Sequence, residues 1–490
     1  MRTPPTRPRL LAALAVVLLA STTATSVLAA ALPSSADGAH QRARRANSDP
    51  RLSPVTRISD GQVEGIERLL NRTANKSWEI GTHLSALLEL SYPSLSPFAD
   101  STSWARPSPS SSPAPTEILS NVAQILESQP QGQQQLVSDG SAADPASVGP
   151  FVVLANFTLD GDEQIGGRTS AQVGEAVQRQ VDVLMSGTPR TPDGAISHRT
   201  EDVELWSDFM YMVPPFFAYL GAVTLNSSHL TEAYTQCALY RTHLRDERTS
   251  LWRHIDNSFP GGGGRADAGL WATGNGWASY GLLRVLATIV NHPDDGVVEE
   301  FASQSRDLAA WAGEIIEGTW AQPRTNQGLR HNYLNESSSF GDSSGTALLS
   351  AATFRLSLLS RRFSTAAVNL TAPSSLALAS AENSYRALVP DRISSAGVVS
   401  PVVDPMSFRE QLDGVKSDGS GASSPEGGAF VLLLEAARRD WVEENGGKEP
   451  SAIDAGVDGM WSAAAGRGHG LGVGGAVVAL AAALALVVSA

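Results

Sequence analysis

The sequence predicts an all-α protein whose helices pair as hairpins around a common axis. Apolar residues recur at three- and four-residue spacing in eleven segments, whereas alternating patterns are scarce and residues 151–155 are the main candidate for a short strand. A closed barrel of six hairpins needs twelve helices, which is close to this count. A solenoid of repeats is the competing architecture, but the sequence has no self-similar period. The eleven segments are 63–70, 78–90, 116–126, 171–184, 203–220, 231–244, 277–290, 299–316, 344–359, 374–388 and 429–440.

Composition divides the chain into zones around a single globular domain at residues 59–440. A polar leader at 31–58 is expected to be disordered, and a Gly-rich linker at 441–470 precedes a hydrophobic tail at 471–490. Inside the domain, the Ser/Pro-rich stretch 96–115 is low in apolar residues and is expected to be a long surface loop. No second linker divides the domain.

The N-terminus is typical of a secretory signal peptide at residues 1–30. Arg2, Arg7 and Arg9 form a basic start, an apolar run follows at 10–20, and small residues then offer a cleavage site. A signal anchor is the alternative. Six Asn-x-Ser/Thr sites fit a secreted glycoprotein. They lie at Asn71, Asn75, Asn156, Asn226, Asn335 and Asn369.

The tail at 471–490 is uncharged and consists almost entirely of Gly, Ala, Val and Leu. Small residues at 462–466 and a short polar spacer with Arg467 and His469 precede it. This order is typical of a glycosylphosphatidylinositol (GPI) attachment signal, with a single-span helix as the alternative. Either would hold the protein at the cell surface, so contact with a membrane is expected only through this tail.

Charge and cysteine content exclude several classes of function. The net charge is −14 and the globular part has no Lys/Arg cluster, so a nucleic-acid partner is not expected. Cys237 is the only cysteine, and it is expected to be buried in the helical stretch 233–239, so a sizeable core must stabilise the fold. Zinc-type spacings, a nucleophile elbow and a Walker loop are absent, and we expect no metal or cofactor. A monomer is expected.

The densest chemical stretch covers residues 191–220. Its first half is a predicted loop with His198 and Arg199, and its second half is a predicted helix near whose first turns Asp208 lies, close to Trp206. A carboxyl group among bulky apolar side chains loses hydration, which raises its pKa and suits it to act as a general acid. The alternative is an aspartate favoured there by the helix dipole.

A second stretch, residues 269–283, predicts a tight turn at 274–276 directly before a helix. Trp271 and Trp277 flank this turn, and Asn275 lies within it. Indole faces complement the C–H faces of a pyranose ring, and backbone amides of the turn can bind hydroxyl groups. The alternative is a turn that is packed with core tryptophans.

Three further stretches carry polar groups. The acidic run 156–166 contains Asp160 and Asp162, and it is otherwise interpreted as a solvated turn, since calcium would need a longer ligand loop. The loop 332–346 could line a pocket or cap the following helix. His254 follows Trp252 and Arg253 in a polar stretch, where a lone histidine is more often structural.

These stretches occur in an order that resembles glycoside hydrolase families 88 and 105, most closely the fungal members of family 105. The shared runs are PRTPDGAISHR, LWSDFMYMVPPFFAYLG, LWRHI, LWATGNGW and NYLNESSSFGDSSGTAL. Upstream, ERLLNRTANKSWEIGTHLSALLEL also resembles the first helices of such a protein. The resemblance covers about residues 60–440, without the leader and the tail.

The resemblance implies an (α/α)6 six-hairpin barrel with its site at one mouth. It also implies an oligosaccharide substrate whose non-reducing sugar carries a C4–C5 double bond, which an aspartic acid protonates before water adds at C5 and the hemiketal opens. By position in the motif, Asp208 is similar to that general acid/base, and the second acid maps to Asp160 or Asp162. The expected substrate-binding residues are His198, Arg199, Trp206, His254, Trp271, Asn275 and Trp277.

One position departs from the family pattern. Many members have an arginine that opens a run R-G-x-G-W, whereas this chain has Thr273 there. Loss of a guanidinium near a uronate removes a charge-assisted contact. The missing positive charge is supplied by Arg199, Arg265 or His254, or the substrate is not the usual unsaturated uronide. The alternatives are therefore a cell-wall glycan hydrolase with a two-carboxylate mechanism, and a non-catalytic glycan-binding wall protein.

Overall fold

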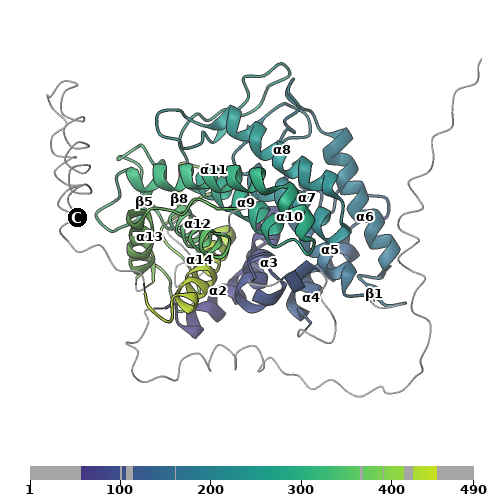
Figure 1. Ribbon diagram of the computed structural model, residues 1–490, viewed down its shortest axis with the longest axis horizontal. Helices are drawn as coiled ribbons and strands as arrows, with labels where there is room; N and C mark the ends of the chain where they lie inside the picture. The colour runs from purple at the N-terminus through teal and green to yellow at the C-terminus, as the bar shows by residue number, and fades with distance from the viewer. Residues whose placement is uncertain are drawn as a thin grey trace, which may run out of the picture. The chain divides into compact units, whose positions relative to one another are not determined.

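Helices dominate the described part of the chain, and its four sheets have only two short antiparallel strands each (Figure 1). The structure is a computed structural model that describes residues 57–99, 102–105, 114–159, 162–364, 368–389, 391–412 and 423–449. The helices are α2 (Asp60–Thr73), α3 (Ser77–Ser91), α4 (Thr116–Ser128), α5 (Gly149–Phe157), α6 (Ser170–Asp182), α7 (Phe209–Thr224), α8 (Ser227–Leu244), α9 (Ala272–Val290), α10 (Asp295–Glu300), α11 (Ala302–Ala321), α12 (Ser343–Arg362), α13 (Ser375–Leu388) and α14 (Pro425–Glu444). The strand pairs are β1 (Gln164–Ile165) with β2 (Arg168–Thr169), β3 (Leu205–Trp206) with β4 (Ile255–Asp256), β5 (Arg330–His331) with β6 (Gly341–Asp342), and β7 (Val402–Val403) with β8 (Gln411–Leu412).

Six inner elements contact one another in a closed ring. Around this ring, α3 contacts the 3₁₀ turn Asp144–Val148 that leads into α5, this turn contacts α7, and α7 contacts α9. The ring continues from α9 to α12 and α14, and α14 returns to α3. Each inner helix follows an outer one in the chain, which gives the hairpins α2–α3, α4–α5, α6–α7, α8–α9, α11–α12 and α13–α14. The six-hairpin barrel is therefore confirmed.

Burial distinguishes the two layers. Every residue of α7 except Thr224 is buried, as are eighteen of the twenty residues of α12. In contrast, the outer helix α2 buries only Gly65, Ile66 and Leu70. A helix that is apolar on all sides belongs inside a fold, whereas an amphipathic one covers it. The sequence pattern of each helix thus determines its layer.

The inner helices α7 and α9 approach closely at a glycine. A Cβ atom at Gly281 would lie 2.0 Å from the backbone oxygen of Met210, so only glycine fits there. Met210 lies two residues after Asp208. This contact therefore fixes the start of α7 against α9.

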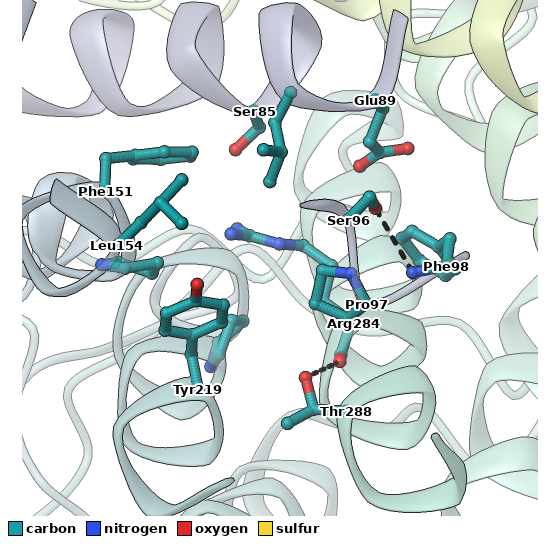
Figure 2. A pocket seen from close by; sticks show the side chains of 13 residues that line it. Ser85, Glu89, Ser96, Pro97, Phe98, Phe151, Leu154, Tyr219, Arg284 and Thr288 are labelled. Atoms are coloured by element: carbon teal, nitrogen blue, oxygen red, sulfur yellow. Dashed lines mark hydrogen bonds between the residues drawn. The ribbon is translucent and has the colours of Figure 1, made fainter. Parts of the chain in front are cut away.

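A small cavity of about 20 Å³ lies where the second halves of α3, α7 and α9 meet α5 (Figure 2). Ser85 and Glu89 come from α3, Tyr219 from α7, and Arg284 from α9. In Figure 2, the polar ends of Tyr219 and Arg284 point into it. This volume accommodates about one water molecule, so side chains fill the barrel here.

Buried charges link the same region. Arg355 of α12 is 1% exposed and donates to Glu89 of α3 at 2.8 Å and to Asp440 of α14 at 2.6 Å. Tyr280 of α9 also donates to Glu89, at 2.5 Å. One guanidinium thus ties three inner helices together.

Several local predictions from the sequence are wrong. Residues 151–155 belong to α5, because a short, continuous apolar run does not distinguish a buried strand from a buried helix. Residues 274–276 form the first turn of α9 and not a turn before it. The predicted linker at 441–470 begins too early, since α14 continues to Glu444. The stretch 96–115 is not simply a surface loop, because Trp104 is fully buried.

The remaining predictions about the fold are confirmed or concern the ends of the chain. All eleven predicted helical segments overlap helices, and Cys237 is buried as expected. The predicted signal peptide at 1–30 and tail at 471–490 lie outside the described residues. Within the described part of the chain, no helix combines the length and apolar character needed to cross a membrane.

Candidate active site

A cleft of about 600 Å³ opens at the N-terminal ends of the inner helices. Trp78 lines it from the start of α3, Asp208 from the start of α7, Trp271 from the start of α9, and Glu426 from the start of α14. Acidic and aromatic side chains are frequent among the lining residues. The others are Lys76, Asp139, Gly140, Asp144, His198, Arg199, Thr200, Glu201, Asp202, Glu204, Trp206, Met212, Gly264, Arg265, Trp277, Pro405, Met406 and Phe408.

Asp208 occupies the N-cap position of α7 but does not cap the helix with its side chain. Instead its carboxyl group faces the cleft, with the side chain 14% exposed. The Oδ2 atom accepts a hydrogen bond from Ser207 Oγ at 3.2 Å and lies 3.4 Å from His254 Nε2. Because the side chain does not serve the helix, its carboxyl group is available to a ligand.

The strand pair β3–β4 brings His254 to Asp208. Trp206 pairs with Ile255 in this antiparallel ladder, so the residues on either side of the pair become neighbours. His254 is fully buried, and its Nδ1 lies 3.0 Å from Asp267 Oδ2. Burial lowers the pKa of His254, but the adjacent carboxylates of Asp208 and Asp267 more than offset this, and the pKa is raised above 6.5.

Asp267 is held as a carboxylate. Burial favours its neutral form, but hydrogen bonds from His254 and from Tyr333 Oη lower its pKa to about 2. The Tyr333 bond measures 2.5 Å, and the Gly269 amide donates to the other oxygen at 3.0 Å. Asp267 therefore carries a negative charge directly behind His254.

Aromatic side chains form the walls around these groups. His198 stacks on Trp206 with 4.9 Å between ring centroids, and Phe408 contacts Trp206, His254 and Trp271 edge-on or at a tilt. Phe408 has a φ of 63°, a region that bulky residues rarely adopt and that costs energy. The contacts of its ring with Trp206, His254 and Trp271 maintain this strained conformation at the cleft wall.

Two further carboxyl groups line another part of the cleft wall. His198 Nε2 lies 3.3 Å from Asp144 Oδ1, and Asp139 accepts a hydrogen bond from the Ser77 amide at 3.1 Å. Burial, together with the charge of Asp144, raises the pKa of Asp139. The sequence interpretation missed both acids, because SDGSAADP has the composition of an ordinary loop.

Glu426 is a buried acid at the cleft floor. It is 2% exposed, and its Oε2 accepts a hydrogen bond from Trp78 Nε1 at 3.0 Å. Burial and the nearby carboxyl groups of Glu79 and Asp208 raise its pKa well above 4.5. The neutral form of the Glu426 carboxyl group is therefore favoured.

The structure brings together most, but not all, of the residues that the sequence singled out. His198, Arg199, Trp206, Asp208, Trp271 and Trp277 line the cleft, and His254 lies behind Asp208. Asn275 does not line it: the amide is fully buried and hydrogen-bonds both backbone groups of Trp252. Asn275 thus fixes the loop that carries His254.

Of the two predicted second acids, only Asp162 belongs to the described part of the chain. Asp160 lies outside the described residues. Asp162 is exposed in the turn before β1 and is not among the lining residues of the cleft. Thr273 is fully buried, and its hydroxyl donates to Asp342 Oδ2 at 3.3 Å. In the described part of the chain, no cluster of three or more potential metal ligands occurs.

Comparisons with known proteins agree on one group of carbohydrate-active enzymes. Residues 167–414, just over half of the chain, match the model of Glycosyl Hydrolase Family 88. No curated protein matches the sequence. A structure from Salmonella enterica, described as a possible member of glycoside hydrolase family 105, superposes with a TM-score of 0.56 at 16% identity and covers 79% of this chain and 97% of its own.

Two other solved structures give the same result. A possible family 105 member from Klebsiella pneumoniae has a TM-score of 0.56 at 17% identity, covering 79% of this chain and 96% of its own. A family 88 glycosyl hydrolase from Bacteroides vulgatus has a TM-score of 0.50 at 15% identity, covering 78% and 99%. At these identities the likeness shows a shared fold.

Proposed function

The chain belongs to Glycosyl Hydrolase Family 88 and is a glycoside hydrolase, and we propose that it acts on oligosaccharides that end in an unsaturated uronyl sugar. Pectin-derived fragments of the rhamnogalacturonan type are the substrate class that the sequence resemblance favours. The position of the Asp208 carboxyl group supports this proposal most directly.

Asp208 has the surroundings that a general acid needs. Its carboxyl group faces the cleft, the Trp206 and Trp271 rings lie close by, and His254 Nε2 lies 3.4 Å behind it. A sugar ring stacked on an indole face would place its edge beside this carboxyl group. General acid catalysis requires a proton donor within hydrogen-bond reach of the reacting atom.

The proposed reaction uses one proton and one water molecule. Asp208 donates a proton to C4 of the C4–C5 double bond, which leaves an oxocarbenium ion at C5. Water adds at C5 and returns a proton to Asp208, giving a hemiketal. The C5–O5 bond then breaks, and the resulting hemiacetal at C1 expels the rest of the oligosaccharide as an alcohol. Asp144 and His198 are expected to contact the sugar.

A second candidate is a hydrolase of the same fold whose substrate lacks a carboxylate. Thr273 is buried and hydrogen-bonded to Asp342, so it offers no cation to the cleft. Glu426 adds a carboxylic acid beside Asp208 instead. A substrate with a neutral or esterified C6 group would not need a cation at the position of Thr273. Because Thr273 offers no cation, a glycan without a uronate carboxylate is the alternative substrate.

The test measures loss of ultraviolet absorbance from the conjugated double bond. Full-length protein is mixed with unsaturated rhamnogalacturonan and glucuronan disaccharides, with Asp208→Asn and Asp162→Asn in parallel. Asp162→Asn is the matched control, because the same change is made at an exposed site outside the cleft. Decay with wild type and Asp162→Asn, but not Asp208→Asn, supports the proposal. Flat traces from folded wild type on every unsaturated disaccharide would refute it.

We also propose that this monomeric enzyme works at the cell surface of a fungus. The support is the signal-peptide pattern at 1–30, the six glycosylation sites and the GPI-like tail at 471–490. Treatment of intact cells with a phosphatidylinositol-specific phospholipase should release the protein into the medium. Protein that stays in the cytosolic fraction, without a mass shift after deglycosylation, would contradict this location.

A further inference from the structure

Four side chains form a series of contacts that begins at the cleft. Asp208 faces the cleft, His254 lies 3.4 Å behind it, Asp267 lies 3.0 Å behind His254, and Tyr333 Oη lies 2.5 Å from Asp267. The first three are 46 and 13 residues apart in sequence and meet only in the fold. The His254 side chain is completely buried, so water does not reach it.

The hydrogen bonds determine which nitrogen of His254 carries a proton. An ionised carboxylate only accepts hydrogen bonds, and Tyr333 and Gly269 both donate to Asp267. His254 Nδ1 must therefore donate to Asp267 as well. In a neutral imidazole the other nitrogen, Nε2, then bears a lone pair that points toward Asp208.

This lone pair cannot face an ionised carboxylate without cost. At 3.4 Å, two acceptors would oppose one another at a fully buried nitrogen, and no other group in the described part of the chain bonds Nε2. One proton between the two atoms removes the conflict, and on Nε2 it gives a cationic imidazole between the carboxyl groups of Asp208 and Asp267. The Phe408 and Trp271 rings, with centroids 4.6 and 4.4 Å away, also favour a cationic imidazole.

We propose that Asp267 is a positioning residue which fixes the His254 tautomer, so that His254 and Asp208 share one proton and His254 serves as the proton reservoir of Asp208. The role in catalysis rests on the proposed function: the shared proton is the one that Asp208 delivers to C4. When water adds at C5, its released proton restores the pair. The sharing of the proton itself does not depend on the identity of the substrate.

Other charged groups around the pair come from several elements. Asp208 lies at the start of α7 and Asp267 in the loop before α9. Behind Asp267, Arg409 lies over the Tyr333 ring and pairs with Glu336 at 3.0 Å. From α14, Glu426 interacts with Asp208. Arg265 lies over the Phe408 ring, 5.1 Å from its centroid. Asp208 and Asp267 contact His254 directly, whereas Arg265 and Arg409 contact only rings next to the pair, which favours retention of the shared proton.

The test follows the titration of His254 by NMR in the full-length protein without substrate. Nine histidines give signals, and the spectrum of His254→Gln identifies the relevant one. We expect the wild-type pKa above the ordinary value of about 6.5. Asp267→Asn should weaken the proton affinity of His254 at least tenfold, whereas Tyr333→Phe, which keeps the Asp267 charge, should change it much less.

Activity gives the second readout. Asp267→Asn should lower kcat about 10- to 100-fold above neutral pH with little change in KM, and the deficit should shrink at acid pH, where the pair regains its proton. A merely structural role would lower the rate equally at every pH. A wild-type His254 that stays neutral down to about pH 5, or one unaffected by Asp267→Asn, would overturn the proposal. If the wild type is inactive on all unsaturated disaccharides, the proposed function fails. The NMR titration still tests whether His254 and Asp208 share a proton.

Discussion

Trp78 and Glu426 join the first and last inner helices of the ring, through a hydrogen bond of 3.0 Å from the indole nitrogen to the carboxyl group. The two residues are 348 positions apart in sequence. The bond therefore closes the barrel at the cleft floor, and the protonation state of Glu426 can be tested there.

Glu426→Gln should leave the free energy of unfolding within ~0.5 kcal/mol of the wild type, because a neutral acid and an amide are similar in shape and both accept the indole hydrogen bond. Glu426→Ala should cost about 1–3 kcal/mol, since it leaves a buried donor unpaired. Urea unfolding near neutral pH measures both. Equal losses for the two variants would show that Glu426 is ionised.

Arg355→Ala should destabilise the fold strongly. It removes the common partner of Glu89 and Asp440. Asp440 keeps Arg439 at 3.0 Å, but the buried carboxyl group of Glu89 loses its ion-pair partner, which costs about 3–5 kcal/mol. Arg361 on the same helix bonds Asn445 at the surface, and Arg361→Ala should change stability by less than about 0.5 kcal/mol. Denaturant unfolding compares the two. Similar midpoints would contradict the structural role of Arg355.

The pH dependence of the free energy of unfolding should show the contribution of the raised His254 pKa. Its folded pKa lies above that of the unfolded chain, so its contribution is complete below about pH 6.5 and is lost as pH rises through the raised pKa. Wild type should therefore lose stability relative to His254→Gln between neutral and alkaline pH. Asp267 behaves oppositely, because its contribution persists until pH falls toward about 2. A difference between wild type and His254→Gln that is constant with pH would contradict the His254 prediction.

Trp206→Phe should weaken substrate turnover without unfolding the protein. The change removes the indole donor to Glu204, 2.7 Å away, and reduces the stacking on His198. We expect kcat/KM to fall about 5- to 10-fold, equivalent to ~1 kcal/mol. Trp311→Phe is the control, because this indole stacks on Tyr234 and does not line the cleft. An unchanged kcat/KM in Trp206→Phe would show that the sugar does not bind against Trp206.

Local sequence patterns predicted the fold and part of the site. Helical spacing identified the hairpins, and bulky apolar neighbours singled out Asp208, Trp271 and Trp277, all of which line the cleft. The interpretation failed where the sequence pattern was ambiguous. Residues 151–155 are uniformly apolar, and no period distinguishes a strand from a helix in so short a run.

Residues that depend on distant partners could not be predicted. Asp267 has no distinctive neighbours in sequence, and it becomes significant only because His254 and Tyr333 meet it. Asp144 begins the 3₁₀ turn Asp144–Val148 and Phe408 lies in a loop, and the composition around each indicates only a turn. Burial raises the pKa of Glu426, and so do Glu79 and Asp208, which come from other helices. Burial and long-range contacts create these properties.

The orientation of the inner helices has a consequence for how the enzyme could acquire new substrates. Because α3, α7, α9 and α14 all begin at the cleft, the connections that precede them would surround a sugar bound there. The opposite halves of α3, α7 and α9 line the water-sized cavity. Exchange of those connections would alter specificity without disturbing the Arg355 cluster. Substrate specificity and stability therefore depend on residues at opposite ends of the barrel. The residues at one end can change while those at the other end are conserved.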